Sequence, residues 1–461
     1  MSQWKRIGAL KIGLLILLVF VLGVTIGLGQ SPKGPSVSGG IYEELRVFTD
    51  VLGLLQKEYV EEITSKNLIY GAIKGMLETL DPHSAFMAPN VYKEMQEETK
   101  GRFEGLGIEI TMKDEILTVV SPIEDTPAFK AGIQAGDQII KIDGELTKNL
   151  TLMDSVKRMR GPKGSKVTIT IMREGFGKLR DFTLVREVIP VRSVRHELLE
   201  KQYGYIRLSQ FQEKTDGDFD KAIKALQEES KGNLKGLILD LRNNPGGLLD
   251  QAVKVSDRFI ESGLIVSVEG RKEEQKMKFY AHSQGTLPNY PVVVLVNGGS
   301  ASASEIVAGA IQDHHRGILL GLQTFGKGSV QTIFPLKDGS GLRLTTARYF
   351  TPSGRSIQAR GIVPDIIVKL APPEEEKAEK AEKAAPLPKM PSEKDLNRHL
   401  DDVEKGAPKE KRERPKKEES KKEEKKEEIK EKKPLDNQVE RAVELLKSWE
   451  VFKSITKGNS K

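Results

Sequence analysis

Two short apolar runs, each followed by a turn of small residues and then by a helical pattern, constrain the fold of this chain most. Residues 237–241 and 291–296 have the length and composition of buried strands. The helical patterns that follow them lie at 249–260 and 304–312. Further strand-like runs continue the alternation across residues 189–370, which predicts an α/β core.

A serine and a lysine lie in small-residue turns of this region. Ser302 stands in the run Asn297-Gly-Gly-Ser-Ala-Ser-Ala-Ser-Glu305, and Lys327 follows later in the chain between two glycines. A serine hydroxyl becomes a nucleophile when a base removes its proton, and a neutral lysine can be that base. The chain contains no cysteine, which excludes a thiol nucleophile. The pattern alone does not separate Ser302 from its neighbours Ser300 and Ser304.

The surroundings of Lys327 favour a neutral amine. The pKa of a free lysine is about 10.4 and must fall by roughly three units, which burial achieves because desolvation penalises the ammonium form. Phe325 and Val330 are apolar neighbours, and the flanking glycines allow close backbone approach. Gln331 follows on the same segment and is the candidate for orienting the lysine amine by a hydrogen bond.

The turn at Ser302 also supplies a candidate oxyanion site. Ser302 precedes a predicted helix, and the first N–H groups of a helix have no partner within it. The N–H of Ala303 is therefore a candidate donor to a developing oxyanion. The loop at 242–247 follows the other buried strand, and its Gly246 or Gly247 is the candidate for the second donor.

Other interpretations of these turns are less well supported. A serine in such a turn is often only a helix cap. Residues 321–327 match the start of a phosphate-binding loop, but Gly328 stands where Ser or Thr must bind magnesium, and a strand rather than a helix follows. The Asp-His-His run at 313–315 lacks the spacing of metal ligands on one helix face. We expect no cofactor and no metal.

Residues 99–188 show a different pattern, of short strands separated by glycine turns. They resemble a PDZ domain in its bacterial permuted form, most clearly in the Ala-Gly-Ile-x-x-Gly-Asp-x-Ile pattern at 131–139. In such a domain, N–H groups beside Gly105, Leu106 and Gly107 can capture a terminal carboxylate while the peptide adds as a strand. Apolar pockets near Leu106 and Ile108 favour nonpolar last residues.

The N-terminal part combines an apolar run with a helical region. Basic residues precede the apolar run at 12–28, so residues 1–30 predict a signal sequence or an uncleaved membrane anchor, and the missing cleavage site favours the anchor. This places the rest of the chain in the cell envelope, on the periplasmic or extracytoplasmic side. Residues 41–98 have helical spacing and predict a packing or dimerisation layer, which makes a homo-oligomer the expected state.

The C-terminal part carries much of the charge. The net charge of +7 does not indicate nucleic-acid binding, because Lys and Glu alternate closely in the tail. Residues 371–434 therefore predict a charged, disordered linker. Residues 435–455 return to helical periodicity, and we expect this last helix to dock on another part of the protein.

Taken together, these motifs resemble those of the carboxy-terminal processing, or tail-specific, proteases. The resemblance runs over residues 42–370 and rests on the PDZ segment and on several motifs in the α/β region, at 239–247, 299–306, 326–331, 348–357 and 361–365. It implies a crotonase-like core and cleavage of proteins near their C-termini. It also implies that Ser302 is the nucleophile, Lys327 the base and Gln331 the orienting residue, and that an adaptor protein is a possible partner.

Two functions of other classes compete with this one. The chain could be a catalytically silent PDZ scaffold that only binds peptides, but the complete set of Ser302, Lys327 and Gln331 argues against that. Cores of this kind also bind small lipid-like ligands or acyl thioesters, but no feature for holding an acyl carrier is visible. We therefore predict a serine endopeptidase.

Overall fold

The computed structural model describes residues 39–113, 115–173, 175–371, 391–401 and 436–458. The chain forms two compact units, one up to Ile73 and one from Lys74 onward. The apolar run predicted as a signal sequence or anchor lies outside the described residues. None of the described helices has the length and apolar character that crossing a membrane requires.

The region predicted as helical contains three helices and one strand. Helices α2 (Gly39–Glu58), α3 (Ser65–Glu78) and α4 (Pro89–Thr99) follow the apolar spacing of the sequence. Strand β1 (Ala85–Met87) was not predicted. The carboxylate of Asp81 accepts the N–H groups of the next turn, and the chain then runs antiparallel to β18. A pairing with a strand so far along the chain leaves no local signal.

A six-stranded sheet forms the centre of the second unit and confirms the predicted α/β core. Its order is β10-β11-β12-β15-β16-β19. Strands β10 and β11 pair antiparallel, and every other neighbouring pair is parallel. These strands are Val194–Leu199, Tyr203–Leu208, Gly236–Asp240, Val292–Val296, Ile318–Gly321 and Ile366–Ile367. Strands β12 and β15 are buried along their whole length, as expected for strands covered on both faces.

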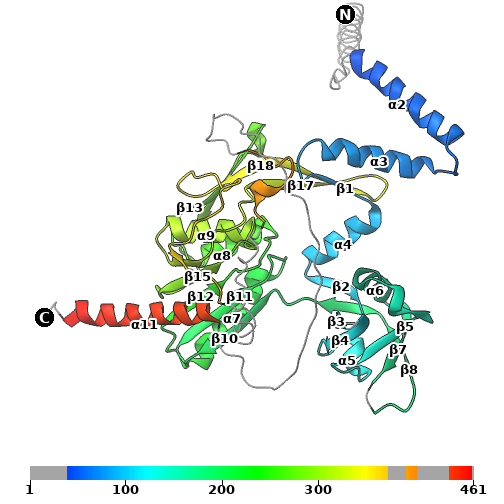
Figure 1. Cartoon of the computed structure of the whole chain (residues 1–461). Coiled ribbons are helices and arrows are strands. Elements are labelled where there is room, and N and C mark those ends of the chain that lie inside the picture. Colours follow the sequence, from blue (N-terminus) through cyan, green and yellow to red (C-terminus); the bar gives the residue numbers. More distant parts are fainter. Residues whose placement is uncertain (1–38, 114, 174, 372–390, 402–435, 459–461) are drawn as a thin grey trace, which may run out of the picture. The chain divides into compact units, whose positions relative to one another are not determined.

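Helices cover both faces of this sheet (Figure 1). Alternate residues of β12 and β15 contribute to two separate apolar clusters, one on each face. Helix α11 packs on one face through a stripe of buried residues (Val439, Ala442, Val443 and Leu446). On the other face lie α7 (Thr215–Glu229), α8 (Leu249–Asp257) and α9 (Ala303–Asp313).

A second sheet carries the segment that follows Lys327. Its order is β1-β18-β13-β14, with β17 on β18. The strands besides β1 are β13 (Gly263–Gly270), β14 (Met277–Ala281), β17 (Ser329–Pro335) and β18 (Gly341–Phe350). The register of β17 against β18 shifts between Val330 and Gln331. Such a bulge redirects the side chains that follow it.

The segment that resembles a PDZ domain folds around its own apolar core. Its sheet has the order β3-β4-β5-β7-β8, formed by Ile108–Lys113, Ile116–Pro122, Gln138–Ile142, Lys166–Met172 and Arg180–Val185, with β6 (Glu145–Leu146) on β5. Helices α5 (Pro127–Lys130) and α6 (Leu152–Met159) complete it. Strands β2 (Arg102–Gly105) and β9 (Glu187–Pro190) pair antiparallel where the chain enters and leaves this domain.

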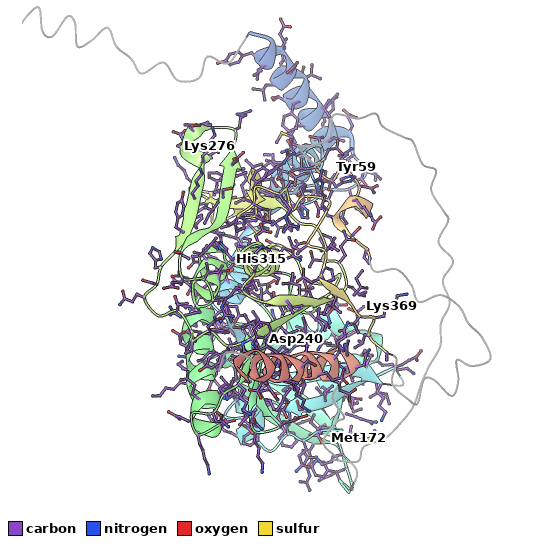
Figure 2. The ribbon with its side chains drawn as sticks, turned by 90° about the vertical axis from the view of Figure 1, so that its left-hand side faces the viewer. Tyr59, Met172, Asp240, Lys276, His315 and Lys369 are labelled. Atoms are coloured by element: carbon purple, nitrogen blue, oxygen red, sulfur yellow. The ribbon has the colours of Figure 1, made fainter. Side chains whose placement is uncertain are left out.

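Part of the tail is ordered where the sequence predicted a disordered linker. Residues 391–401 fall within the predicted disordered linker, yet they contain the short helix η3 (Glu393–Asp395), and Glu393 is fully buried. The linker prediction is therefore wrong for these residues, because the acidic side chain finds partners inside the protein. Helix α11 (Asn437–Gly458) overlaps the range 435–455 predicted for the last helix and ends beyond it. Figure 2 shows it beside Asp240, at the end of β12.

Candidate active site

Ser302 lies on a sharp turn between β15 and α9. Its φ of 54° is in the left-handed region, which costs a non-glycine residue on the order of 1–3 kcal/mol. A strained turn from strand to helix is a known way to present a nucleophile. The neighbouring hydroxyls of Ser300 and Ser304 are buried and donate to the main-chain oxygens of Leu241 and Asn244, at 2.8 and 2.9 Å. The structure thus separates Ser302 from its neighbours, which the pattern of residues could not do.

Tyr349 on β18 faces the Ser302 side chain. Burial raises the pKa of Tyr349 to about 12, so its hydroxyl stays protonated at neutral pH. A neutral hydroxyl beside the serine can donate to it or accept from it. Tyr349 was not among the residues predicted from sequence, because nothing in the motif around it indicates the contact.

Glu305 connects the serine turn to the lysine loop. It is fully buried, and its Oε2 accepts the N–H groups of Ser302 and Lys327 at 2.8 and 2.9 Å. Its Oε1 accepts the Thr324 hydroxyl at 2.5 Å and the Gly326 N–H at 2.7 Å. Burial raises the pKa of Glu305 to about 7, and the four hydrogen bonds oppose that rise. A glutamate three residues after a helix cap is a recognised sequence signal that could have identified this residue.

Residues 324–328 form the lysine loop, and each of their N–H groups donates within the chain. The acceptors, in order along the loop, are Ile362 O, Ser300 O, Glu305 Oε1, Glu305 Oε2 and Gln358 Oε1. A phosphate-binding loop needs such groups free to hold its ligand. The loop that resembles one in sequence is therefore built to fix the position of Lys327.

The Lys327 side chain is partly buried, and its environment favours the neutral amine. Burial lowers the pKa of Lys327, and the positive charge of Arg343 lowers it further. The acidic groups of Glu393, Glu305 and Asp81 act in the opposite direction. Across the described residues, no hydrogen bond joins Lys327 Nζ to Ser302 Oγ, although the two backbones are linked through Glu305.

Gln331 lies near this site but does not bind the lysine amine in the structure. Its Nε2 donates to Ser329 Oγ at 3.0 Å and to Thr345 Oγ1 at 3.3 Å. Thr345 Oγ1 in turn donates to Asp81 Oδ1 at 3.1 Å. Gln331 therefore joins a polar network that leads to Asp81, one of the carboxylates that raise the pKa of Lys327.

The two glycines that are candidates for the oxyanion site differ in whether their N–H groups already have an acceptor. Gly246 has a φ of 103°, and a Cβ at this residue would lie 2.9 Å from Ser302 Cβ and 3.0 Å from the Ala303 nitrogen. Its N–H already donates to Asn244 Oδ1 at 2.9 Å. The N–H groups of Gly247 and Ala303 donate to no other group in the described part of the chain. The geometry thus favours Gly247 and Ala303 as the free donors.

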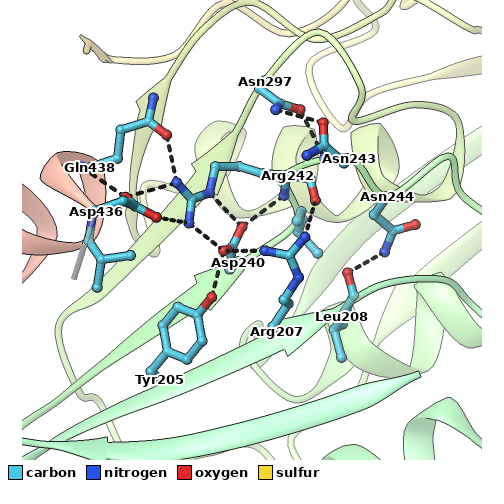
Figure 3. A network of polar contacts seen from close by, with 12 residues as sticks. Tyr205, Arg207, Leu208, Asp240, Arg242, Asn243, Asn244, Asn297, Asp436 and Gln438 are labelled. Carbon is cyan, nitrogen blue, oxygen red and sulfur yellow. Dashed lines mark hydrogen bonds and ion pairs between the residues drawn. The ribbon is translucent and has the colours of Figure 1, made fainter. Parts of the chain in front are cut away.

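A charged network holds the start of the glycine loop (Figure 3). Arg242 donates to both oxygens of the fully buried Asp240, at 2.9 and 2.7 Å. From the tail, Asp436 Oδ1 and Gln438 Oε1 accept from the same guanidinium at 3.0 and 2.8 Å. Sequence analysis predicted docking of the last helix without a target, and Arg242 is one target.

A pair of asparagines fastens the glycine loop to the serine turn. The Asn243 N–H donates to Asn297 Oδ1, and Asn297 Nδ2 donates to Asn243 Oδ1, both at 2.9 Å (Figure 3). Asn297 begins the turn that leads to Ser302. The two loops that would supply the oxyanion donors are therefore held together by side chains as well as by packing.

The residues predicted to bind a peptide tail lie at one edge of the PDZ-like sheet. Strand β3 is an edge strand, and α6 packs against it. The N–H groups of Leu106 and Gly107 donate to no group in the described residues. The Leu106 side chain, however, fills the domain core, while Ile108 is only partly buried. Ile108 is therefore better placed than Leu106 to contact a ligand.

The Asp-His-His run considered as a metal site has other partners. Asp313 pairs with Arg355, and His314 Nε2 lies 2.7 Å from the main-chain oxygen of Leu264. Within the described ranges, no group of three or more acidic or histidine side chains is arranged to hold a metal.

Three family descriptions match successive parts of the chain. Residues 202–368 match peptidase family S41, residues 105–184 match the PDZ domain, and residues 29–91 match the N-terminal domain of the activating protease CtpB. The first covers both loops of the candidate site, and the second covers the β3 edge.

Curated proteins match over most of the chain. A carboxy-terminal-processing protease of Bartonella bacilliformis is 49% identical, over 78% of this chain and 83% of its own length. The carboxy-terminal processing protease CtpA of Bacillus subtilis is 38% identical, over 77% and 74% of the two chains. Among solved structures, a photosystem II D1 C-terminal processing protease is 31% identical, with a TM-score of 0.41, over 71% of this chain and 93% of its own.

Proposed function

This chain belongs to peptidase family S41 as a C-terminal processing serine protease with a PDZ domain, and we propose that Ser302 is its nucleophile and Lys327 its general base. The observation that carries the assignment is the shared carboxylate of Glu305, which ties the backbones of these two residues to one buried point. Burial of the lysine side chain lowers the pKa of Lys327, which supports a neutral amine that can accept a proton.

In the proposed reaction, the Ser302 hydroxyl gives its proton to Lys327 and attacks the scissile carbonyl carbon. The N–H groups of Gly247 and Ala303 stabilise the oxyanion that forms. Lys327 then passes the proton to the leaving amine, which departs as the new N-terminus. Water then attacks the acyl carbonyl carbon as Lys327 accepts its proton. The ester bond to Ser302 breaks, Lys327 returns the proton to the serine oxygen, and the new C-terminal carboxylate is released.

The lysine amine has to meet the serine hydroxyl for this reaction to proceed. We propose that Gln331 orients the amine once a substrate is bound, because its present partners are only neighbouring hydroxyls that it can exchange. Catalytic hydrogen bonds are often long in the unliganded enzyme and tighten in the complex. The Tyr349 hydroxyl beside Ser302 is a further group that can guide the proton.

Cleavage assays with single variants test the catalytic assignment. Wild type should degrade fluorescein-labelled casein, an unfolded protein, while Ser302→Ala and Lys327→Ala should lose activity by at least about a thousandfold. Equal cleavage by all three proteins would refute the mechanism. No cleavage by wild type, combined with binding of tail peptides, would instead support the silent PDZ scaffold.

Protein substrates bind through the PDZ domain for cleavage near their C-termini. The finer proposal is that the free N–H groups near Leu106 and Gly107 hold the terminal carboxylate, and that the tail pairs with the edge of β3. Ile108 then favours nonpolar last residues. We also propose that this docking completes the catalytic site. A variant lacking residues 99–188 that kept full, tail-selective cleavage would contradict both ideas.

We propose that the protein acts in the cell envelope as a homo-oligomer, with an N-terminal membrane anchor. The basic residues and apolar run before residue 30 support the anchor. Helix α2 leaves Leu45, Phe48 and Leu55 exposed at helical spacing, which supports a dimer formed through this helix. Sedimentation of wild type and of Phe48→Glu tests the dimer, and fractionation with and without residues 1–30 tests the anchor.

A further inference from the structure

Residues 391–401, the tail segment, place a buried carboxylate next to the lysine loop. Glu393 is fully buried. Its Oε1 and Oε2 lie 2.8 and 2.9 Å from His83 Nε2, and its Oε1 also accepts Gln358 Nε2 at 3.0 Å. A buried carboxylate needs such partners, because an uncompensated charge in the interior is costly. The contacts with His83 and Gln358 compensate the burial of this acid.

The tail segment holds the lysine loop on both sides of Lys327. Before the lysine, the Glu393 N–H donates to Phe325 O at 3.0 Å. After it, Gly328 N–H donates to Gln358 Oε1 at 3.0 Å, and the amide of this buried glutamine donates back to Glu393. Gln358 Nε2 also donates to Leu400 O at 3.1 Å, near the other end of the segment. The loop is thus clamped from outside the protease core.

Glu393 also contacts the side of the site that carries Gln331. Its partner His83 follows Asp81, whose Oδ1 accepts the hydroxyl of Thr345. The His83 main-chain oxygen accepts Arg343 Nε at 2.9 Å. Arg343 and Asp81 are two of the charged groups that shift the pKa of Lys327, the first lowering it and the second raising it. Glu393 therefore contacts the lysine loop through its main-chain N–H, and its carboxylate reaches the polar network opposite through His83.

We propose that Glu393 is a positioning residue of the catalytic centre, and that the tail segment is a built-in clamp holding Lys327 in place for catalysis. The inference rests on the proposed role of Lys327 as the base. It gives part of the charged tail a definite task, whereas its composition predicts only a linker.

The matched variants are Glu393→Gln and Asp401→Asn in the full-length chain. Glu393→Gln keeps the volume but removes the charge, and it replaces one of the two acceptor oxygens facing His83 by an amide donor. Asp401→Asn removes a charge from the same segment at an exposed position. Glu305, Asp81, Arg343 and His83 stay in place in both variants, so any difference in pH profile comes from the tail carboxylate.

We expect Glu393→Gln to lower kcat on labelled casein by about tenfold to a hundredfold, because small misplacements of a catalytic group have effects of this size, with KM nearly unchanged. The acid limb of kcat should also move to lower pH, since a charge that favours protonated Lys327 is gone. Asp401→Asn should match wild type in both.

The outcomes separate this proposal from the proposed function. If Lys327→Ala is inactive while Glu393→Gln matches wild type in kcat and pH profile, the clamp is refuted and the base is not. A lower kcat with an unmoved acid limb would assign Glu393 to folding alone and also overturn the proposal. Activity of Lys327→Ala would refute the base itself.

Discussion

The backbone N–H groups of Ser302 and Lys327 donate to the same atom, Oε2 of Glu305. The serine stands on a strained helix cap and the lysine on a loop, so neither element alone fixes the distance between them. Because both N–H groups bind the same buried oxygen, the Glu305 side chain fixes the distance between the two backbones. The remaining freedom lies in the lysine side chain, which is where substrate-dependent alignment must act.

We predict that Glu305→Gln lowers kcat by at least about a hundredfold, because displacing a catalytic group by roughly 1 Å has this effect. The amide offers one acceptor oxygen, while four donors converge on the carboxylate. Its NH2 group must therefore face two donors and push one loop away. Steady-state cleavage of labelled casein measures the loss. Glu228→Gln, an exposed substitution on α7, is the control that should keep wild-type activity.

The pH dependence of stability checks the state of Glu305 independently of activity. Burial raises its pKa from 4.5 to about 7, so the folded protein binds this proton more tightly than the unfolded chain. The stabilisation is present below pH 4.5 and lost as the pH rises to about 7. Relative to Glu305→Gln, the free energy of unfolding of wild type should fall by about 3 kcal/mol over this range. Urea unfolding that shows a constant difference would contradict the prediction.

Arg343 should set the pH at which the base becomes active. Its positive charge lowers the pKa of Lys327, in addition to the larger effect of burial. Removing the charge in Arg343→Gln raises the lysine pKa, so the rising limb of kcat should move to higher pH. Arg343→Lys keeps the charge and should leave the limb nearly in place. If kcat rises over the same pH range in wild type and in Arg343→Gln, a group other than Arg343 controls that range.

The sequence predicted the elements of the site better than the contacts between them. Strands β12 and β15 and helix α9 are visible as local apolar patterns, and Ser302, Lys327 and the glycine loop follow from motifs on these elements. Strand β1 and the buried part of the tail were missed. Their partners are far away in the chain: His83 and Glu393 are 310 residues apart, and Arg242 and Asp436 are 194 apart. Periodicity carries no information at that range.

Gly246→Ala should abolish most of the activity without unfolding the protein. The new Cβ would lie 2.9 Å from Ser302 Cβ and 2.8 Å from Ala301 O, closer than packed atoms tolerate, at a φ that side chains rarely adopt. The loop or the serine must shift, and we expect kcat to fall by about a hundredfold or more. Gly217→Ala, in helix α7 with open space around it, is the matched control and should be fully active. Equal activity of the two variants would refute close packing at Gly246.

The last prediction concerns the contact between helix α11 and the glycine loop. Asp436 accepts from Arg242 and also from the N–H groups of Gln438 and Val439 at the start of the helix, both at 3.0 Å. Asn can replace Asp as a helix cap, so Asp436→Asn keeps the cap but removes the charge and one acceptor oxygen that faces Arg242.

Burial alone would raise the pKa of Asp436, but its bond to Arg242 and the charge of that residue lower it. A lowered pKa gives stability that is present at neutral pH and lost as the pH falls through the folded value. The carboxylate is 38% exposed, so we expect a loss of only about 1 kcal/mol in Asp436→Asn at neutral pH. Because Asp240 still holds Arg242, kcat should fall only a few-fold. Urea unfolding at neutral and acid pH measures the effect, with Glu440→Gln on the exposed face of α11 as control. If both variants lose the same stability at every pH, the helix docks through its apolar stripe alone.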